Sequence, residues 1–442
     1  MGASTTACRR DPLDAPALRQ RVVTLTEEHA SWWAATPAIL PALGPRCGLR
    51  RHVANARAAT RLVDALAGEM TRVPDDAAGR EAWRQSVRER LQDFGDRRLG
   101  WPSGYRRLVF ADDFFAVSRE FAREARRFDP ELRLSDLWQA LRNVWIGNSL
   151  QMLLDRPLVL GQGLFAYSML YPLTDNLLDD PQLDRLAKRD FGQRFGDRLA
   201  GRPARPTSAR ESAVFALVQR VEEEFARATF PDVHESLLAI HDAQMRSLRQ
   251  HLGPALGADE LLAISCEKGG TSVLADLYLV AGAATLDEER FGFGYGVFLQ
   301  LLDDLQDVES DLAAGHRTLF TVAAGRGPLD EPTARLARFM NDVLDTSPLL
   351  GRPEAADRKD LILRNCTSLL IGAIAEQPRR FSRRFRRAIA GQWPLSLRAT
   401  RRLRRRAEQR FGAAARALEG RTGSGSLLDW VLSQDPAPGD LE

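Results

Sequence analysis

The sequence predicts an all-α fold, and three observations lead to that prediction. Apolar residues recur at helical spacing in long segments, for example Leu137, Leu141 and Val144 within residues 135–154. Short turns containing proline and glycine, such as Gly253 followed by Pro254, separate these segments. No alternation of apolar and polar residues between hairpin turns indicates a strand. A helical bundle is therefore the expected architecture.

The elements follow in order along the chain. Residues 1–125 are rich in Ala and Arg, helical in pattern, and expected to form an additional helical N-terminal extension. Residues 126–420 are expected to be the main α-domain, whose first clear helix can be capped by Ser135 or Asp136. Residues 421–442 are expected to form a loose tail. Further helical patterns span residues 214–225, 236–252, 260–283, 291–312 and 358–376.

Composition narrows the class of protein. Of the 442 residues, 44% are hydrophobic, which is enough for a sizeable core. The 62 Lys+Arg nearly balance the 59 Asp+Glu, so we expect no nucleic-acid-coating function. The longest apolar stretch, residues 158–173, is too short and too polar to span a membrane, and no secretory signal is recognisable. Cys8, Cys47, Cys266 and Cys366 form no CxxC or metal-binding pattern. These features predict a soluble, cytoplasmic protein.

Two acidic clusters stand in windows that contain no Lys, Arg or His. The windows are residues 157–184 and 291–315. On a helix, the two residues Asp175 and Asp179 share a face, and Asp303 and Asp307 do so as well. Like charges at this spacing repel, and no basic neighbour neutralises them. The acids of the two windows are Asp175, Asp179, Asp180 and Asp184, and Asp303, Asp304, Asp307, Glu309 and Asp311.

Carboxylates grouped in this way are typical ligands of a hard divalent cation. Two facing helices that each offer an Asp pair would hold Mg²⁺ and a diphosphate between them. The alternative is a solvated face, since the second cluster shares one arc with Gln306 and Ser310, opposite an apolar stripe. The predicted metal ligands are Asp175, Asp179, Asp180, Asp303, Asp304 and Asp307.

The motifs resemble those of a known superfamily. Residues 295–307 resemble the second aspartate-rich motif of polyprenyl diphosphate synthases, in which a glutamine precedes DDxxD. Residues 311–319 resemble the DxxxGKxTL segment that follows it there, and residues 268–272 resemble the Lys-containing helix of the same enzymes. Residues 175–179 read DNxxD, closer to squalene and phytoene synthases. The resemblance to class I isoprenoid synthases implies their all-α isoprenoid (terpenoid) synthase bundle, with the N-terminal extension outside it.

The resemblance also implies a chemistry. Several Mg²⁺ ions would bridge the aspartate motifs and the diphosphate of an allylic prenyl substrate, and would assist the departure of that diphosphate. Lys268, one of three lysines in the chain, would contact the diphosphate. Arg317 would replace the family's lysine, since His316 stands at that position, and Gln300 completes the catalytic set. The carbocation needs a dry, aromatic cavity. Candidate wall residues, with plain core as the alternative, are Phe165, Tyr171, Tyr295 and Phe298.

Three functions stay open. Terpene cyclisation or rearrangement is favoured, because no histidine lies between His52 and the first motif and no Gly-Lys-Arg segment is recognisable for a second, homoallylic diphosphate. The NSE-type motif of most bacterial cyclases is also missing, so chain elongation or head-to-head prenyl transfer remains an alternative. The third is a non-catalytic membrane- or nucleic-acid-binding protein, because the segment between Arg379 and Arg410 is dense in arginine. That segment is also a candidate for peripheral membrane contact by an enzyme, and related folds often dimerise.

Overall fold

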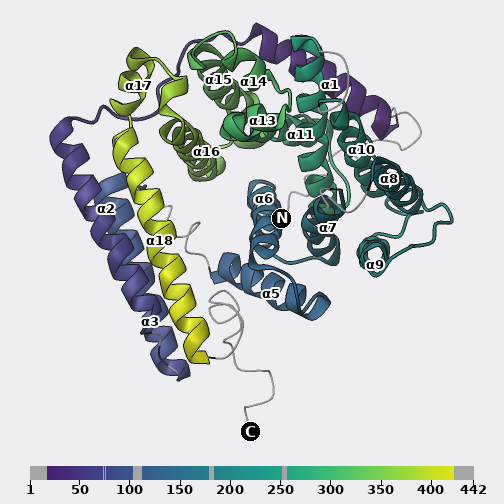
Figure 1. Cartoon of the computed structure of the whole chain (residues 1–442), viewed down its shortest axis with the longest axis horizontal. Coiled ribbons are helices and arrows are strands. Elements are labelled where there is room, and N and C mark those ends of the chain that lie inside the picture. The colour runs from purple at the N-terminus through teal and green to yellow at the C-terminus, as the bar shows by residue number, and fades with distance from the viewer. Residues whose placement is uncertain are drawn as a thin grey trace, which may run out of the picture.

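The all-α prediction is confirmed. The computed structural model describes residues 17–72, 74, 76–102, 112–178, 184–250 and 256–422, and within these ranges every regular element is a helix (Figure 1). None of the described helices is long and apolar enough to cross a membrane. The α-helices are α1 (Leu18–Ala35), α2 (Leu49–Met70), α3 (Ala77–Phe94), α5 (Asp112–Phe128), α6 (Leu134–Leu153), α7 (Gln162–Leu178), α8 (Arg185–Leu199), α9 (Ala209–Glu224), α10 (Pro231–Ser247), α11 (Ala258–Ala281), α12 (Leu286–Gln306), α13 (Val308–Ala314), α14 (Leu319–Ala324), α15 (Asp330–Thr346), α16 (Ala356–Glu376), α17 (Arg383–Ala390) and α18 (Leu397–Thr422).

Helix α11 is the centre of the bundle. It packs against α1, α6, α7, α10 and α12, and its residues are buried on nearly every side between Leu261 and Leu279. A helix that is apolar all round belongs in a core, because it has no polar face to present to water. Cys266 on this helix is buried and free, as are Cys47 and Cys366, while Cys8 lies outside the described residues.

Helices α11 and α12 touch backbone to backbone. A Cβ added at Gly296 would lie 2.1 Å from the carbonyl oxygen of Gly269, and one added at Gly269 would lie 2.4 Å from the oxygen of Gly296. Only glycine permits this approach, since any side chain would force the helices apart. The glycine series of α12 therefore serves close helix packing, and Gly294 likewise packs against His29 of α1.

The predicted single helix over residues 291–312 is two helices. Helix α12 ends at Gln306 and α13 begins at Val308, with Asp307 between them. The side-chain amide of Gln377, distant in sequence, donates hydrogen bonds to the carbonyl oxygens of Leu305 and Gln306 at 3.0 and 2.7 Å. Those bonds satisfy carbonyls that a helix end leaves without a partner, so the break is stabilised by a tertiary contact.

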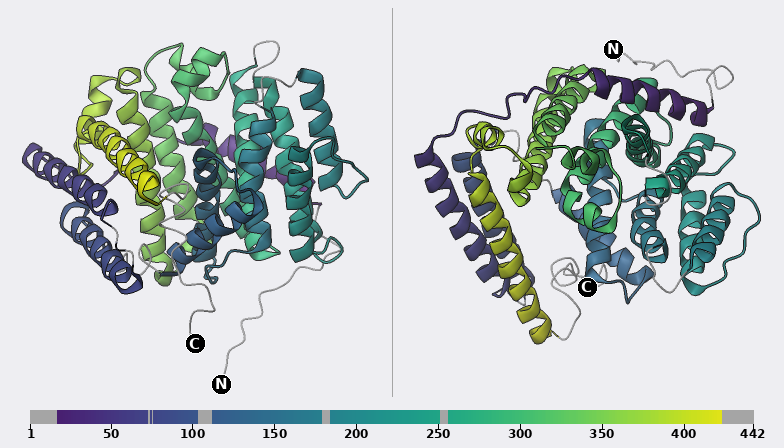
Figure 2. Two further views of the ribbon diagram at one scale, coloured as in Figure 1. Left: turned by 60° about the horizontal axis from the view of Figure 1, so that its bottom comes forward. Right: turned by 45° about the horizontal axis from the view of Figure 1, so that its top comes forward.

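The described helices among the first 125 residues lie in two places. Helices α2 and α3 pack together, and α2 packs along α18 in a layer beside the bundle (Figures 1 and 2). Helix α1 instead crosses the bundle, where Leu18, Val22 and Trp33 join the main hydrophobic core. Helix α5, which begins at Asp112, also contributes to that core. Of the predicted loose tail over residues 421–442, residues 421 and 422 belong to the end of α18, and the others lie outside the described residues.

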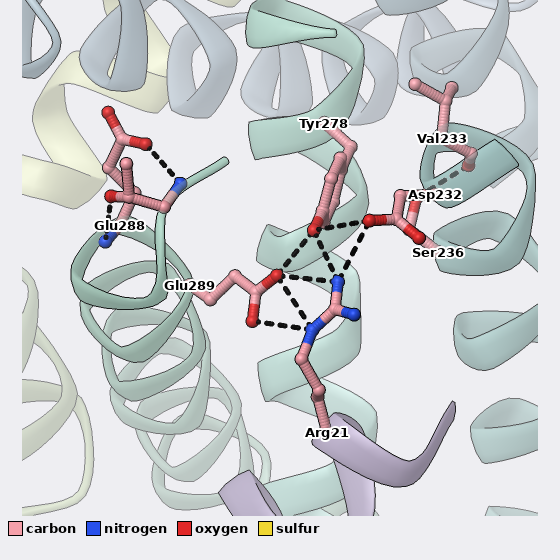
Figure 3. Close-up of polar contacts among 8 residues, drawn as sticks. Arg21, Asp232, Val233, Ser236, Tyr278, Glu288 and Glu289 are labelled. Atoms are coloured by element: carbon pink, nitrogen blue, oxygen red, sulfur yellow. Dashed lines mark hydrogen bonds and ion pairs between the residues drawn. The ribbon is translucent and has the colours of Figure 1, made fainter. Parts of the chain in front are cut away.

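A buried ion-pair network fastens α1 to the bundle (Figure 3). The Arg21 guanidinium donates to both carboxylate oxygens of Glu289, with Nε at 3.1 Å from each. Its Nη2 donates to Asp232 and to the Tyr278 hydroxyl, both at 3.0 Å. Because Glu289 is only 2% exposed, its charge depends on these donors.

Candidate functional site at the carboxylate end of the bundle

Asp303 and Asp307 lie one turn apart where α12 ends. Both side chains are exposed, yet desolvation is the main cause that raises the pKa of each. Asp303 and Asp307 are thus recessed: water reaches both carboxylates, but the surrounding protein removes part of their hydration. Asp303 further raises the pKa of Asp307, and Asp311 raises both, so the three negative charges repel one another. This end of the bundle therefore carries an excess of negative charge.

Asp304 faces the opposite way, into the bundle. It is 5% exposed, and its oxygens accept hydrogen bonds from Gln300 Nε2 and Ser265 Oγ, each at 2.9 Å. Desolvation, together with the neighbouring charge of Asp303, raises the pKa of Asp304 to about 7. The sequence interpretation made Asp304 a metal ligand and Gln300 a catalytic residue. In the structure the two side chains bind each other, and Asp304 also ties α12 to Ser265 of α11.

Two cations act on these carboxylates. Lys268, half-buried on α11, attracts the charge of Asp303 and opposes the rise in its pKa. Arg142, exposed on α6, opposes the rise at both Asp303 and Asp307. In the part of the chain that the structure describes, neither cation has an acid within ion-pair distance, so both can receive an anion. Sequence reasoning missed Arg142, although it is the only basic residue of α6.

The loop after α13 brings His316, rather than Arg317, toward the cluster. Gly315 has a φ of 72°, which reverses the chain and lets the backbone N–H of His316 donate to the carbonyl of Asp311. His316 Nδ1 lies 3.1 Å from the Asp311 carboxylate, and His316 also lowers the pKa of Asp307. The backbone N–H of Arg317 donates to the carbonyl of Gln250, and its Nε is buried with no hydrogen-bond partner among the described residues.

The C-terminal part of α7, where the first aspartate motif begins, lies at the same end of the bundle. Gly163, near the start of α7, packs against Leu279 near the end of α11, and Tyr171 Oη hydrogen-bonds Ser272 Oγ. The two helices are thus antiparallel, and one further turn brings the backbone of Asp175 level with Lys268. Of Asp175 only the backbone, within α7, is described. The remaining two predicted ligands of this motif lie outside the described residues; they are Asp179 and Asp180.

Three of the four aromatic side chains proposed as cavity walls contact different neighbours. Tyr171 faces α11, where it contacts Ser272. Phe165, two turns earlier on the same helix, faces α5 and α9 instead, with the Arg220 guanidinium 4.8 Å above its ring. Tyr295 hydrogen-bonds Cys366 of α16. Phe165, Tyr295 and Phe298 are buried core residues.

A buried polar cluster lies between α6, α7 and α11, which sequence reasoning did not find. Asn143 Nδ2 donates to Asp276 Oδ1 at 2.9 Å and to Ser168 Oγ at 3.1 Å. The other oxygen of Asp276 is buried with no hydrogen-bond partner among the described residues. Desolvation raises the pKa of Asp276 well above its ordinary value, because burial disfavours the charged carboxylate. The feature of the sequence that could have indicated this cluster is an aspartate inside the otherwise apolar run of residues 273–280.

The donor set at the carboxylate end fits a hard cation shared with a ligand. Asp303 and Asp307 offer accessible oxygens with no ion-pair partner in the part of the chain that the structure describes. Mg²⁺ binds through one or two carboxylates, waters and phosphate oxygens. Across the described ranges, no group of three or more His, Cys, Asp or Glu side chains is arranged to hold a metal unaided.

No protein-family model matches the chain, and no curated protein matches it.

Proposed function

We propose that this chain is a class I isoprenoid synthase with the helical bundle of that superfamily. It would ionise an allylic prenyl diphosphate in a Mg²⁺-dependent reaction. Of the possible fates of the resulting cation, cyclisation or rearrangement is the one we favour. The observation that carries the proposal is the recessed pair Asp303 and Asp307, together with the two cations that act on it, Lys268 and Arg142. Among the described residues, neither cation has an acid within ion-pair distance. The motif resemblance of residues 295–307 and 311–319 supports the same assignment.

In this proposal, cations of the chain bind the substrate diphosphate. Lys268 and Arg142 come from different helices and would contact its oxygens from two sides, with the Arg142 fork suited to two oxygens at once. The two cations would neutralise part of the negative charge of the diphosphate before the allylic C–O bond breaks, which makes it a better leaving group. The electron pair of that bond leaves with the diphosphate, and the allylic carbon becomes the cation.

Asp303 and Asp307, with Asp175, Asp179 and Asp180 of the first motif, would hold the Mg²⁺ ions. When bound, Mg²⁺ supplies Lewis-acid neutralisation of the diphosphate. The hydrogen bonds from Gln300 and Ser265 to Asp304 fix the end of α12, so that the Asp303 carboxylate is oriented before substrate arrives. Asp304 is thus a positioning residue in this proposal.

The test is incubation of the protein and Mg²⁺ with allylic diphosphates of ten, fifteen, twenty and twenty-five carbons, each with and without isopentenyl diphosphate. Diphosphate release with a cyclic or rearranged hydrocarbon, in the absence of isopentenyl diphosphate, is the expected result. Longer diphosphates formed only in its presence would make the chain an elongating prenyltransferase, and a linear dimer would indicate head-to-head coupling. No diphosphate release under any condition would refute the enzymatic assignment and favour the non-catalytic binding protein.

A matched pair of variants connects turnover to the site. Asp303→Asn keeps the shape of the side chain and should lower the rate of diphosphate release about a hundredfold or more, as expected when a group that organises charge stabilisation is lost. Glu309→Gln is the control, because Glu309 is an exposed acid nearby that pairs with Arg380 at 2.8 Å. Equal rates for the two variants would contradict the assignment of Asp303.

A further inference from the structure

A pocket of about 400 Å³ lies where α16, α17 and the start of α18 meet, three helices that lie close together in Figure 1. The wall contains the apolar residues Ala375, Pro378, Ala390 and Leu397. The proposed synthase function does not use this pocket. Its other lining residues are the five arginines Arg383, Arg386, Arg387, Arg398 and Arg401.

The charge of these arginines is almost uncompensated. Arg401 pairs with Glu376, its Nε lying 3.4 Å from a carboxylate oxygen. For the other four, no acid among the described residues lies within ion-pair distance. The Nε atom of Arg386 is shielded from water and makes no hydrogen bond in the described part of the chain. Guanidinium groups gathered in this way repel one another, and an anion between them removes that repulsion.

Arginines outside the pocket differ in their partners. Further along α18, Arg404 pairs with Glu408, and Arg406 and Arg410 both pair with Asp64 of α2. Arg402 and Arg405 have no acid within ion-pair distance among the described residues, but they do not line the pocket. What distinguishes the pocket is that five guanidinium groups line one cavity, so that a single anion there can contact several of them.

The pocket is also preorganised. Ser382 caps α17, its Oγ accepting a hydrogen bond from the N–H of Phe385 at 3.1 Å, and the buried side chains of Phe385 and Ile389 anchor the helix. The three α17 arginines have i, i+3 and i+4 spacing and so share one face, as do the two on α18. Planar guanidinium forks on converging helices match phosphate oxygens in pairs.

We propose that this pocket binds a phosphate compound with at least two negative charges, such as a diphosphate group, without a metal ion. The site is separate from the carboxylate cluster of α12, and the inference does not depend on the synthase assignment. The same group occurs in free oligophosphates and in phosphorylated lipid headgroups, so the test includes both sources.

The test compares two double variants that remove equal charge. Arg387→Ala with Arg398→Ala removes two exposed pocket arginines, and Arg402→Ala with Arg405→Ala removes two exposed arginines of α18 that do not line the pocket. Sodium pyrophosphate is titrated into the full chain by calorimetry at low salt in the presence of a chelator. Sedimentation with phosphatidylcholine vesicles, with and without phosphatidylinositol bisphosphate, tests the lipid source.

We expect one pyrophosphate to bind at the pocket of each chain, about tenfold or more weakly in the pocket variant and with unchanged affinity in the control variant. Binding only to the phosphoinositide vesicles, lost in the pocket variant alone, would assign the site to a lipid headgroup. If neither probe binds, or if both double variants lose binding equally, the pocket is not a phosphate site. Retained pyrophosphate binding with no synthase turnover would support this inference while refuting the proposed function.

Discussion

Replacing Arg21 by methionine removes the cation from the buried network that joins α1 to α10, α11 and α12 (Figure 3). Glu289 then keeps a nearly inaccessible carboxylate with the Tyr278 hydroxyl as its remaining donor in the network. Breaking a buried pair by removing one partner typically costs about 3–5 kcal/mol, because the other charge stays desolvated. We expect Arg21→Met to lower the free energy of unfolding by an amount in this range, measured by urea denaturation followed by circular dichroism.

Two controls separate this effect from loss of packing or net charge. Arg19, on the same helix, forms exposed ion pairs with Glu235 and Asp242, so Arg19→Met should cost at most about 1 kcal/mol. Adding Glu289→Gln to Arg21→Met removes the unpaired charge and should recover part of the lost stability. The reasoning is refuted if Arg21→Met is no more harmful than Arg19→Met, or if the double variant is less stable than the single one.

Three further predictions concern the core and the site. Gly296→Ala should cost about 1–3 kcal/mol or more, because its Cβ would meet the α11 backbone, whereas Gly372→Ala, which meets nothing within 4 Å, should be neutral or slightly stabilising by thermal denaturation. Burial raises the pKa of Asp276, so the stability that its neutral form contributes is present below about pH 4 and is lost as pH rises through the folded pKa. Relative to Asp276→Asn, the wild type should therefore lose up to about 1.4 kcal/mol per pH unit above pH 4 in urea denaturation, and a gap independent of pH would disprove a buried neutral acid. Lys268→Ala should lower kcat/KM for diphosphate release at least about tenfold. The control is Lys359→Ala, which removes an ion-paired lysine of α16 and should leave kcat/KM unchanged. Equal kcat/KM values for the two variants would show that Lys268 does not bind the diphosphate.

Features carried by local periodicity were predictable from the sequence. The helices and the all-α class follow from the spacing of apolar residues. In a helix, sequence spacing alone decides which residues share a face, so the pattern can be read without knowing the rest of the fold. The same periodicity placed Asp303 and Asp307 one turn apart, and the structure keeps both exposed at the end of α12. It could not show the break at Asp307, because the side chain that stabilises this break, Gln377, is about 70 residues away in sequence.

The roles of single side chains depended on tertiary packing. The sequence grouped Asp304 with its neighbours, but the backbone contact of α11 and α12 at Gly269 and Gly296 sets the helix register that brings Ser265 to Asp304. The same holds for Arg142, whose helix carries no aspartate motif and whose relation to α12 arises only in the folded bundle. By itself, the sequence determined the helices, their apolar faces and the positions of the acidic clusters. Tertiary structure alone decided which carboxylates are desolvated, which are hydrogen-bonded and which cations face them, because those properties depend on atoms contributed by other helices.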